Sequence, residues 1–387
     1  MDSLKDLAKK AKEIVNHPRN QNLKEMWQRH DKLQIVEQIP FCMDMRDSMW
    51  GRFLGYDLNE LTPEKIPELI RFQLEQKVFY HDRICDDTII HPHLHTSSYA
   101  VPTVSLTMFG AKRTNIPRTE GWSVEPIINT EADLKKLENL RIPHDPSSAR
   151  SRADRYSDLI DGELPISPTG ISGFNRGPMD TAVQLRGWQS LMFDMIDRPA
   201  FVHDLMEAIT RCRLDYETRR AEMLNIDLKK SGGGLWEDDV NCDVLSPELY
   251  EEFIFPYEKR MADQYQTVTY HSCGNLTPVL PLIDSLPNLH KLYFSEPWTD
   301  FESARMVVDN RKIIRVDLNP PTNIGASAET VGESLAGFAA NAKCAVAEFH
   351  MASARTGSVD EVLAWIELGK KTMHAARRFD TGNEVSR

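Results

Sequence analysis

The chain has 387 residues, of which 41% are hydrophobic, and its formal net charge is -12. This acidic balance argues against a nucleic-acid partner, because phosphate contacts need clustered Lys and Arg. No apolar run approaches the ~20 residues that span a bilayer, and the N-terminus lacks an apolar signal core. The cysteines are widely scattered and do not suggest a disulfide framework. We therefore expect a cytoplasmic protein without membrane or nucleic-acid partners.

The N-terminal part of the chain mixes helical and extended patterns. Residues 1–31 carry apolar side chains at helical spacing from Leu4 to Ile14, which predicts a helical extension. A strand is predicted at 35–43, and a helix at 63–80 with Thr62 as its cap.

Histidines and prolines mark the next segment. His91, His93 and His95 alternate along an extended stretch that leads into a predicted strand at 99–104. They fit either a metal or substrate contact or a polar loop. Residues 110–163 are charged, poorly periodic and interrupted by prolines, so we expect an excursion from the main fold, such as a small subdomain or lid.

From residue 163 onward, strand and helix patterns alternate regularly. Strands are predicted at 164–172, 233–237, 267–270, 291–295, 312–317 and 344–349. Helices are predicted at 181–195, 199–223, 247–265, 276–285, 301–308, 329–340 and 360–377. Ser246 before Pro247, and the capping-box pairs Ser358–Glu361 and Thr299–Glu302, mark helix starts. With the two earlier strands, this alternation predicts a single (β/α)8 TIM barrel spanning residues 1–387.

A zinc site is the main chemical prediction. Barrel chemistry lies where strands end and helices begin. His271 and Cys273 stand two residues apart at a strand end, so their side chains point to the same face. Glu296 and His350 follow later strands. Zinc takes Cys sulfur, His nitrogen and carboxylate oxygen in tetrahedral sets, so we predict that these four residues bind one zinc ion.

Each of these residues also has a simpler interpretation. His271 and Cys273 could be a structural pair, Glu296 a solvated carboxylate and His350 a packed imidazole. Cys344 is an alternative third ligand, but it stands at the start of its predicted strand and should lie at the opposite end of the barrel.

Several segments resemble the uroporphyrinogen decarboxylase superfamily. They are Gly173-Phe-Asn-Arg-Gly-Pro178, Leu185-Arg-Gly-Trp188, and Asp239 through Ser246-Pro-Glu-Leu-Tyr-Glu-Glu-Phe-Ile-Phe-Pro256. His271-Ser-Cys-Gly-Asn275 resembles the branch of zinc-dependent, corrinoid-linked methyltransferases. The resemblance extends over about residues 164–370 and implies a (β/α)8 barrel.

Two departures from the superfamily pattern carry information. The decarboxylases hold substrate carboxylates with an Arg-Gln-Ala-Gly-Arg type run, whereas the matching stretch here reads Phe41-Cys-Met-Asp-Met-Arg-Asp47, which disfavours decarboxylation. The zinc branch has a further Cys at the end of the last strand, where this chain has His350 or Met351. Zinc held by His271, Cys273, Glu296 and His350 would be neutral overall. It would be a better Lewis acid toward oxygen than a site with two thiolates.

This charge count favours one reaction within the zinc branch. The resemblance implies transfer of a methyl group from a small donor, and an aryl methyl ether fits best, to the cob(I)alamin of a partner corrinoid protein. Glu237, Asp238 and Asp239, at an adjacent strand end, could supply a proton to the leaving oxygen or cap the following loop. Asn175 and the aromatic residues Phe174, Trp236, Trp298 and Trp50 are the predicted substrate contacts.

Other functions stay open at this stage. The chain contains no Asp-x-His-x-x-Gly cobalamin signature, so a partner protein would carry the corrinoid. The alternatives are methyl transfer from a methylcobamide to a thiol such as coenzyme M, a decarboxylase-like lyase, and a non-catalytic barrel that binds the corrinoid protein. Many such barrels form homodimers, but no sequence pattern identifies the face involved.

Overall fold

The computed structural model describes residues 2–45, 47–62, 64–96, 109–115, 122–138, 140–142, 146–167, 173–318, 328–352 and 358–378. The chain divides into two compact units. Unit 1 consists of Met1–Val101, Asp145–Gly170 and Ile313–Arg387. Unit 2 consists of Pro102–His144 and Ile171–Lys312.

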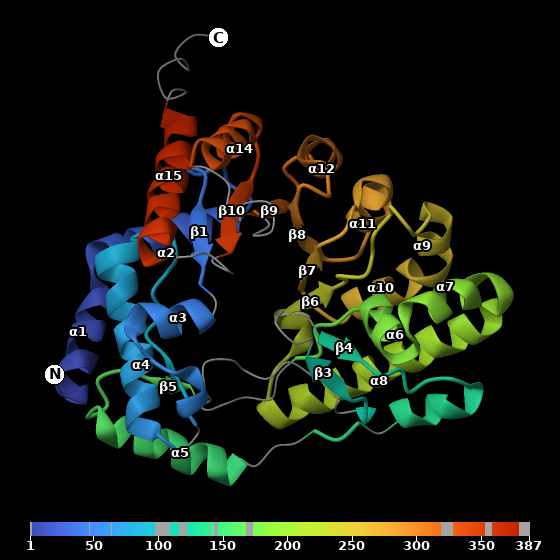
Figure 1. Cartoon of the computed structure of the whole chain (residues 1–387), viewed down its shortest axis with the longest axis horizontal. Helices are drawn as coiled ribbons and strands as arrows, with labels where there is room; N and C mark the ends of the chain where they lie inside the picture. Colours follow the sequence, from blue (N-terminus) through green and yellow to red (C-terminus); the bar gives the residue numbers. More distant parts are fainter. Residues whose placement is uncertain are drawn as a thin grey trace. The chain divides into compact units, whose positions relative to one another are not determined.

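Unit 1 combines helices with parallel strands (Figure 1). Its strands are β1 (Phe41–Asp44), β2 (Leu94–His95), β5 (Ile166–Ser167), β9 (Ile313–Leu318) and β10 (Ala347–Ala352). Its helices are α1 (Leu4–Asn16), α2 (Pro18–His30), α3 (Asp47–Leu54), α4 (Ile66–Phe79), α5 (Pro146–Leu159), α14 (Ala328–Asn341) and α15 (Val359–Arg378), with short turns at Leu58–Glu60 and Tyr80–Ile84. β10 pairs in parallel with both β1 and β9, while β2 and β5 form a separate parallel pair.

The first helix has the amphipathic character expected from the sequence. Ser3 caps α1 by accepting a hydrogen bond from the Asp6 amide. Leu7, Ala8 and Ala11 are buried in a cluster that includes residues of α4 and α5. The apolar face of α1 therefore anchors the N-terminal helices to the rest of unit 1.

Unit 2 holds the remaining strands and most of the regular alternation (Figure 1). Its strands are β3 (Arg113–Asn115), β4 (Trp122–Val124), β6 (Gly232–Trp236), β7 (Thr267–Ser272) and β8 (Leu289–Glu296). Its helices are α6 (Pro178–Arg186), α7 (Trp188–Asp197), α8 (Pro199–Leu224), α9 (Pro247–Phe253), α10 (Phe255–Ala262), α11 (Leu280–Asp284) and α12 (Phe301–Val308), with short 3-10 turns at Glu131–Leu137, Leu228–Lys230 and Thr277–Val279. β7 lies between β6 and β8 and is parallel to both, whereas β3 and β4 form an antiparallel pair.

Most predicted elements are present, but some boundaries differ for identifiable reasons. The helix predicted at 181–195 begins at Pro178 and is divided at Gly187, whose φ is 88°. The helix predicted at 247–265 is divided near Pro256, which lacks the N–H that a continuous helix needs. Asp300, not Thr299, caps α12. The predicted strand at 99–104 lies outside the described residues.

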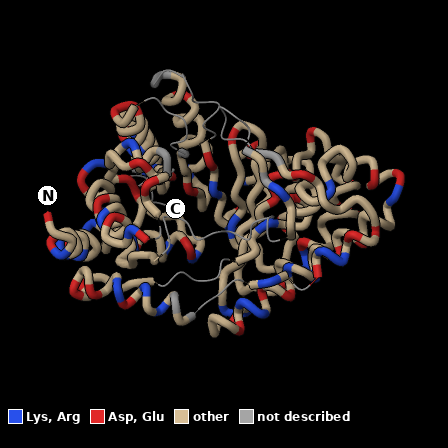
Figure 2. The backbone as a smooth tube through the Cα atoms, turned by 60° about the horizontal axis from the view of Figure 1, so that its bottom comes forward, with Lys and Arg blue, Asp and Glu red and all other residues tan. Residues whose placement is uncertain are grey.

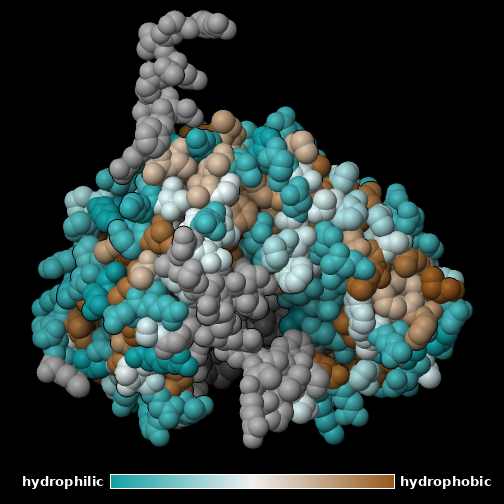
Figure 3. Space-filling view, turned by 45° about the horizontal axis from the view of Figure 1, so that its top comes forward, coloured by the Kyte–Doolittle hydropathy of each residue, from teal (hydrophilic) through white to brown (hydrophobic). Residues whose placement is uncertain are grey.

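Charged residues of both signs occur throughout the described part of the chain. Figure 2 shows Lys and Arg interspersed with Asp and Glu along the backbone. Figure 3 shows scattered hydrophobic patches on a mainly hydrophilic face, and the exposed apolar side chains of unit 2 include Phe193 and Ile196 on α7. None of the helices in the described part of the chain is long and apolar enough to cross a membrane.

Candidate functional site

β7 positions the first two predicted ligands. Tyr270 is fully buried and donates a hydrogen bond to Glu258 of α10, so the helix-facing side of the strand is fixed. The next residue, His271, therefore faces the other way, as does Cys273 beyond the strand end. The His271 Nε2 atom lies 3.4 Å from the Cys273 Sγ atom. The imidazole is buried, whereas the thiol-bearing residue is exposed.

A carboxylate from the neighbouring strand joins this pair. Asp238 follows β6, and its Oδ1 atom lies 3.1 Å from the Nε2 atom of His271. One ligand atom from each of His271, Cys273 and Asp238 lies within 4.8 Å of the others. Burial opposes ionisation of Asp238, but hydrogen bonding and the charge of His271 outweigh it and lower the pKa of the carboxyl group. Nitrogen, sulfur and anionic oxygen together suit zinc.

The orientation of the His271 ring is fixed by β8. Its Nδ1 atom lies 3.3 Å from the backbone carbonyl oxygen of Tyr293. The His271 ring also stacks on the ring of Tyr293, with the two centroids 3.8 Å apart. A backbone carbonyl next to Nδ1 favours the tautomer in which Nε2 is free to bind a metal. The strand register thus presents Nε2 to Cys273 and Asp238.

The turn after Cys273 is held on both sides. Gly274 packs so closely that a Cβ atom there would lie 2.3 Å from the Val240 carbonyl oxygen, so the glycine is needed for close approach. The Ser272 hydroxyl donates to that same carbonyl at 2.9 Å. Thr299 donates to the Gly274 carbonyl oxygen and accepts from the Leu276 amide, both at 2.9 Å. These contacts limit the movement of Cys273 relative to its neighbours.

The two other predicted zinc ligands have different surroundings. Glu296 ends β8, and its carboxylate is not part of the close group formed by His271, Cys273 and Asp238 among the described residues. Burial, together with the charge of Asp300, raises the pKa of Glu296 to about 7. Its role as a ligand therefore stays a prediction, with Asp238 as the carboxylate that lies closer.

His350 belongs to unit 1 and forms a second group there. Its Nδ1 atom lies 3.1 Å from Asp44, and Asp317 completes a set of ligand atoms within 4.8 Å. Burial disfavours the charged ring, but hydrogen bonds to Asp44 and Glu348 outweigh it and raise the pKa of His350 to about 9. Its binding to the same ion as His271 stays a prediction. Cys344 is exposed and precedes β10, as expected from the sequence.

In unit 2, a cavity of about 380 Å³ adjoins the group formed by Asp238, His271 and Cys273, called here the zinc-type group. Asp238 is part of its wall, and Asp239 and Asp180 line it together with Arg176 and Trp188. Asp180 is almost fully buried and forms an ion pair with Arg176. Burial, the negative charge of Asp180 and a hydrogen bond to it raise the pKa of Asp239 to about 8. These surroundings favour the protonated form of the Asp239 carboxyl group near neutral pH.

Glu237, predicted either as a proton donor or as a cap, has the surroundings of a cap. Its side chain has no exposed surface, and it accepts hydrogen bonds from the Met179 amide at 3.2 Å and the Asp180 amide at 2.8 Å. These amides belong to the first turn of α6, where backbone N–H groups have no helical partner. Glu237 thus holds the backbone of Asp180 in place. Burial, and then the negative charge of Glu258, raise the pKa of Glu237.

The aromatic residues predicted to contact the substrate differ in burial and in surroundings. Phe174 is 1% exposed and packs against Phe109 and Tyr216, so it is a core residue and not part of a pocket wall. Trp298 is 48% exposed. Trp236 remains near the site, with its ring centroid 6.3 Å from that of His271.

Trp50 and Asn175 were also predicted to contact the substrate. Trp50 is buried in unit 1 against Phe53, Phe79 and Tyr80, which corrects its placement in a substrate wall. The Asn175 carbonyl oxygen accepts a hydrogen bond from the Trp236 amide at 2.9 Å, and its contact with substrate stays a prediction. The exposed side chains of His91, His93 and His95 are absent from the metal-type groups of the described residues.

Sequence reasoning missed Arg176, Asp180, Gln184 and Trp188 as cavity residues. A signal for Asp180 was present, because an acidic residue in the first turn of a helix beginning with Pro178 is drawn to the helix N-terminus. Arg176 stands four residues before Asp180, a spacing that suits an ion pair.

Comparisons with known proteins place the whole chain in context. Residues 103–345 match the family model described as uroporphyrinogen decarboxylase (URO-D). A solved structure of a methyltransferase from Methanosarcina mazei superimposes with a TM-score of 0.59 and 15% sequence identity, covering 93% of this chain and 99% of that chain. Comparison with curated protein sequences gives no match. The predicted (β/α)8 TIM barrel is confirmed by these similarities and by the alternation of parallel strands with helices.

Proposed function

Within the uroporphyrinogen decarboxylase family, to which this chain belongs, we propose that the protein is a zinc-dependent methyltransferase. Its substrate would be a small methyl donor, with an aryl methyl ether as the best fit. The acceptor would be the cob(I)alamin of a partner corrinoid protein. The observation that carries the proposal is the close group of His271, Cys273 and Asp238 beside a cavity that holds a protonated carboxyl group.

The ligand chemistry supports a metal-dependent reaction. A thiolate, an imidazole and a carboxylate fit zinc, and their two negative charges balance Zn²⁺. If Asp238 and not Glu296 is the carboxylate ligand of the predicted zinc site, the ligands still carry two negative charges. Zinc held there would supply a neutral Lewis acid suited to polarising an ether oxygen.

The cavity residues would perform the acid chemistry. In this reaction the C–O bond of the donor would break, the electron pair of cob(I)alamin would form the new bond to the methyl carbon, and the leaving oxygen would take a proton. Asp239 is suited to donate that proton because its pKa of about 8 keeps it protonated at neutral pH. Asp180 orients the Asp239 carboxyl group, and Arg176 holds Asp180 in place.

The cavity size also suits a small donor. About 380 Å³ is within the range that encloses small organic ligands, roughly 300–1,000 Å³. Trp188 and Val183 supply apolar surface for an aromatic ring, and Gln184 supplies an amide. The amide nitrogen of Gln184 donates to Asp180 at 3.0 Å, so this side chain also belongs to the acid network.

The test is an anaerobic assay of the full-length, zinc-loaded protein with 2-methoxyphenol and free cob(I)alamin. Formation of methylcobalamin together with catechol, both lost in Cys273→Ala, would support the proposal. A parallel reaction with methylcobalamin and coenzyme M tests the acceptor-side alternative. A third with uroporphyrinogen tests the lyase alternative. Turnover in either parallel reaction without ether cleavage would overturn the donor-side assignment.

A further inference from the structure

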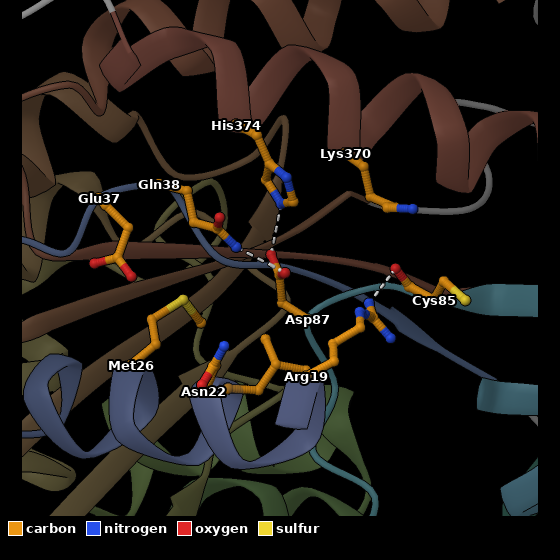
Figure 4. Close-up of a pocket in the computed structure, with 10 residues that line it drawn as sticks. Arg19, Asn22, Met26, Glu37, Gln38, Cys85, Asp87, Lys370 and His374 are labelled. Carbon is orange, nitrogen blue, oxygen red and sulfur yellow. Dashed lines mark hydrogen bonds and ion pairs between the residues drawn. The ribbon is translucent and has the colours of Figure 1, made fainter. Parts of the chain in front are cut away.

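A second cavity lies in unit 1, on the surface between α2 and α15 (Figure 4). Its volume is about 470 Å³. Arg19 and Asn22 enter it from α2, and Lys370 and His374 from α15, while Asp87 lies between them. None of these residues belongs to the zinc-type group or to the cavity beside it.

Arg19 uses only part of its hydrogen-bond donors within the protein. Its Nη2 atom donates to the carbonyl oxygens of Cys85 at 2.5 Å and Asp86 at 2.6 Å, which fixes the plane of the guanidinium group. A guanidinium has five N–H groups, and the remaining ones have no partner within the described part of the chain. Arg19 is thus a rigidly held cation with free donors at the cavity.

Lys370 is the second cation of the cavity, and its one acidic neighbour is distant. Its side chain is only 21% exposed, yet its closest acidic partner is the well-exposed Glu367, 3.6 Å away. That distance exceeds a hydrogen bond. In Figure 4 Lys370 and Arg19 come from opposite helices and extend toward the same side of the cavity, near Cys85. Partly buried ammonium groups are stabilised by an anionic partner.

The acidic residues of the cavity are already occupied. Asp87 is 2% exposed and accepts from the Phe41 amide at 2.9 Å, from Gln38 at 2.8 Å and from His374 at 2.8 Å. Glu37 accepts two hydrogen bonds from Arg29, at 2.9 and 2.7 Å. Within the described part of the chain, neither Asp87 nor Glu37 forms an ion pair with Arg19 or Lys370.

We propose that this cavity binds a small molecule through an oxyanion, with a phosphate group as the best fit. A guanidinium suits two phosphate oxygens at once, and an ammonium suits a further oxygen as a point charge. The amide of exposed Asn22 is an additional donor within the same cavity. Bound phosphate would connect the N-terminal helix α2 with the last helix α15.

The experiment is calorimetric titration of the full-length protein with inorganic phosphate, and separately with succinate, at fixed ionic strength. The informative variant is Lys370→Gln, because in the described part of the chain the Lys370 ammonium makes no hydrogen bond whose loss would unfold the protein. Lys371→Gln is the matched control, since Lys371 is the adjacent, exposed lysine of the same helix. Arg19→Gln is a second test, with thermal unfolding used to confirm that it is folded.

We expect phosphate to bind the wild type and Lys371→Gln equally. Binding to Lys370→Gln and to folded Arg19→Gln should be at least about tenfold weaker. Binding of succinate in place of phosphate, with the same dependence on Lys370, would overturn the phosphate assignment and leave a carboxylate site. Absence of binding by either anion, or equal binding by Lys370→Gln and wild type, would overturn the proposal as a whole.

Discussion

The Nε2 atom of His271 lies 3.1 Å from the Oδ1 atom of Asp238, although the two residues follow different strands. The register explains this proximity, because Trp236 of β6 is paired with His271 of β7. Asp238 stands two residues after Trp236, as Cys273 stands two residues after His271, so both return to the same face. The imidazole is nearly buried and the carboxylate half-exposed, which leaves the pair accessible from one side.

Replacement of Asp238 tests which carboxylate binds zinc. Asp238→Asn keeps the shape of the side chain but removes its charge, so zinc affinity should fall by at least about tenfold. Glu296→Gln is the matched control and should retain zinc. Competition with a chelator, followed by elemental analysis of the protein, measures both. The opposite pattern, with zinc lost only from Glu296→Gln, would return the ligand role to Glu296.

Replacement of Gly274 tests the close packing of the turn that carries Cys273. The new Cβ atom of Gly274→Ala would lie 2.3 Å from a backbone oxygen, and overpacking of this kind costs ~1–3 kcal/mol. Gly337→Ala, on α14, meets no atom within 4 Å and should stabilise the helix by up to ~1 kcal/mol. Urea unfolding gives both free energies. Equal effects of the two alanines would contradict the packing argument.

The pH dependence of the reaction tests the role of Asp239. A proton donor with a pKa of about 8 is active below that pH, so kcat should fall as the pH rises through about 8. Asp239→Asn cannot donate in the same way and should lower kcat by about 10²–10⁴-fold, with this alkaline limb absent. Steady-state rates of catechol release from 2-methoxyphenol between pH 6 and pH 10 (roughly two pKa units either side of 8) would show it. An alkaline limb that persists in Asp239→Asn would assign the titration to another group.

A buried carboxyl group beneath the site makes a separate prediction about stability. Burial raises the pKa of Glu258 from 4.5 to about 7, although hydrogen bonds from Tyr250 and Tyr270 oppose the shift. Its folded-state pKa exceeds the unfolded value, so its contribution is complete below pH 4.5 and is lost as the pH rises to about 7.

Glu258→Gln should remove this loss, because glutamine does not titrate. The free energy of unfolding of the variant should therefore decline less than that of the wild type between pH 5 and pH 7, an interval inside the titration range. Glu248→Gln, at an exposed position on α9, is the control and should follow the wild type in this range. Parallel slopes for Glu258→Gln and wild type would contradict the assigned pKa.

Local sequence patterns predicted the fold well because strands, turns and helix caps depend on neighbouring residues. Ser246 caps α9 as predicted, accepting from the Leu249 amide at 3.3 Å. The site was harder to predict, because pairing across strands decides which rim residues meet. Glu237 and Asp238 are adjacent in sequence, yet one is buried under α6 and the other lies beside His271. Strand periodicity alone places such neighbours on opposite faces but does not say which face holds the chemistry.

His350 offers a way to test the predicted fourth ligand without an activity assay. Its pKa of about 9 means that the folded protein holds a proton that the unfolded chain releases near pH 6.5. The resulting stability is complete below pH 6.5 and is lost as the pH rises through about 9. Asp44→Asn removes a carboxylate 3.1 Å from the ring, so it should lower both this pKa and the stability at neutral pH.

Zinc changes this titration only if it binds His350. A metal-bound imidazole must give up the proton, so His350 should then be neutral at every pH at which zinc stays bound. NMR titration of labelled histidines, with and without zinc, distinguishes the two cases. Loss of the transition near pH 9 on zinc addition, in wild type but not in Cys273→Ala, would make His350 a ligand of the same ion as Cys273. A transition that persists with zinc bound would leave His271, Cys273 and Asp238 as the protein ligands, with His350 as a cation held by Asp44.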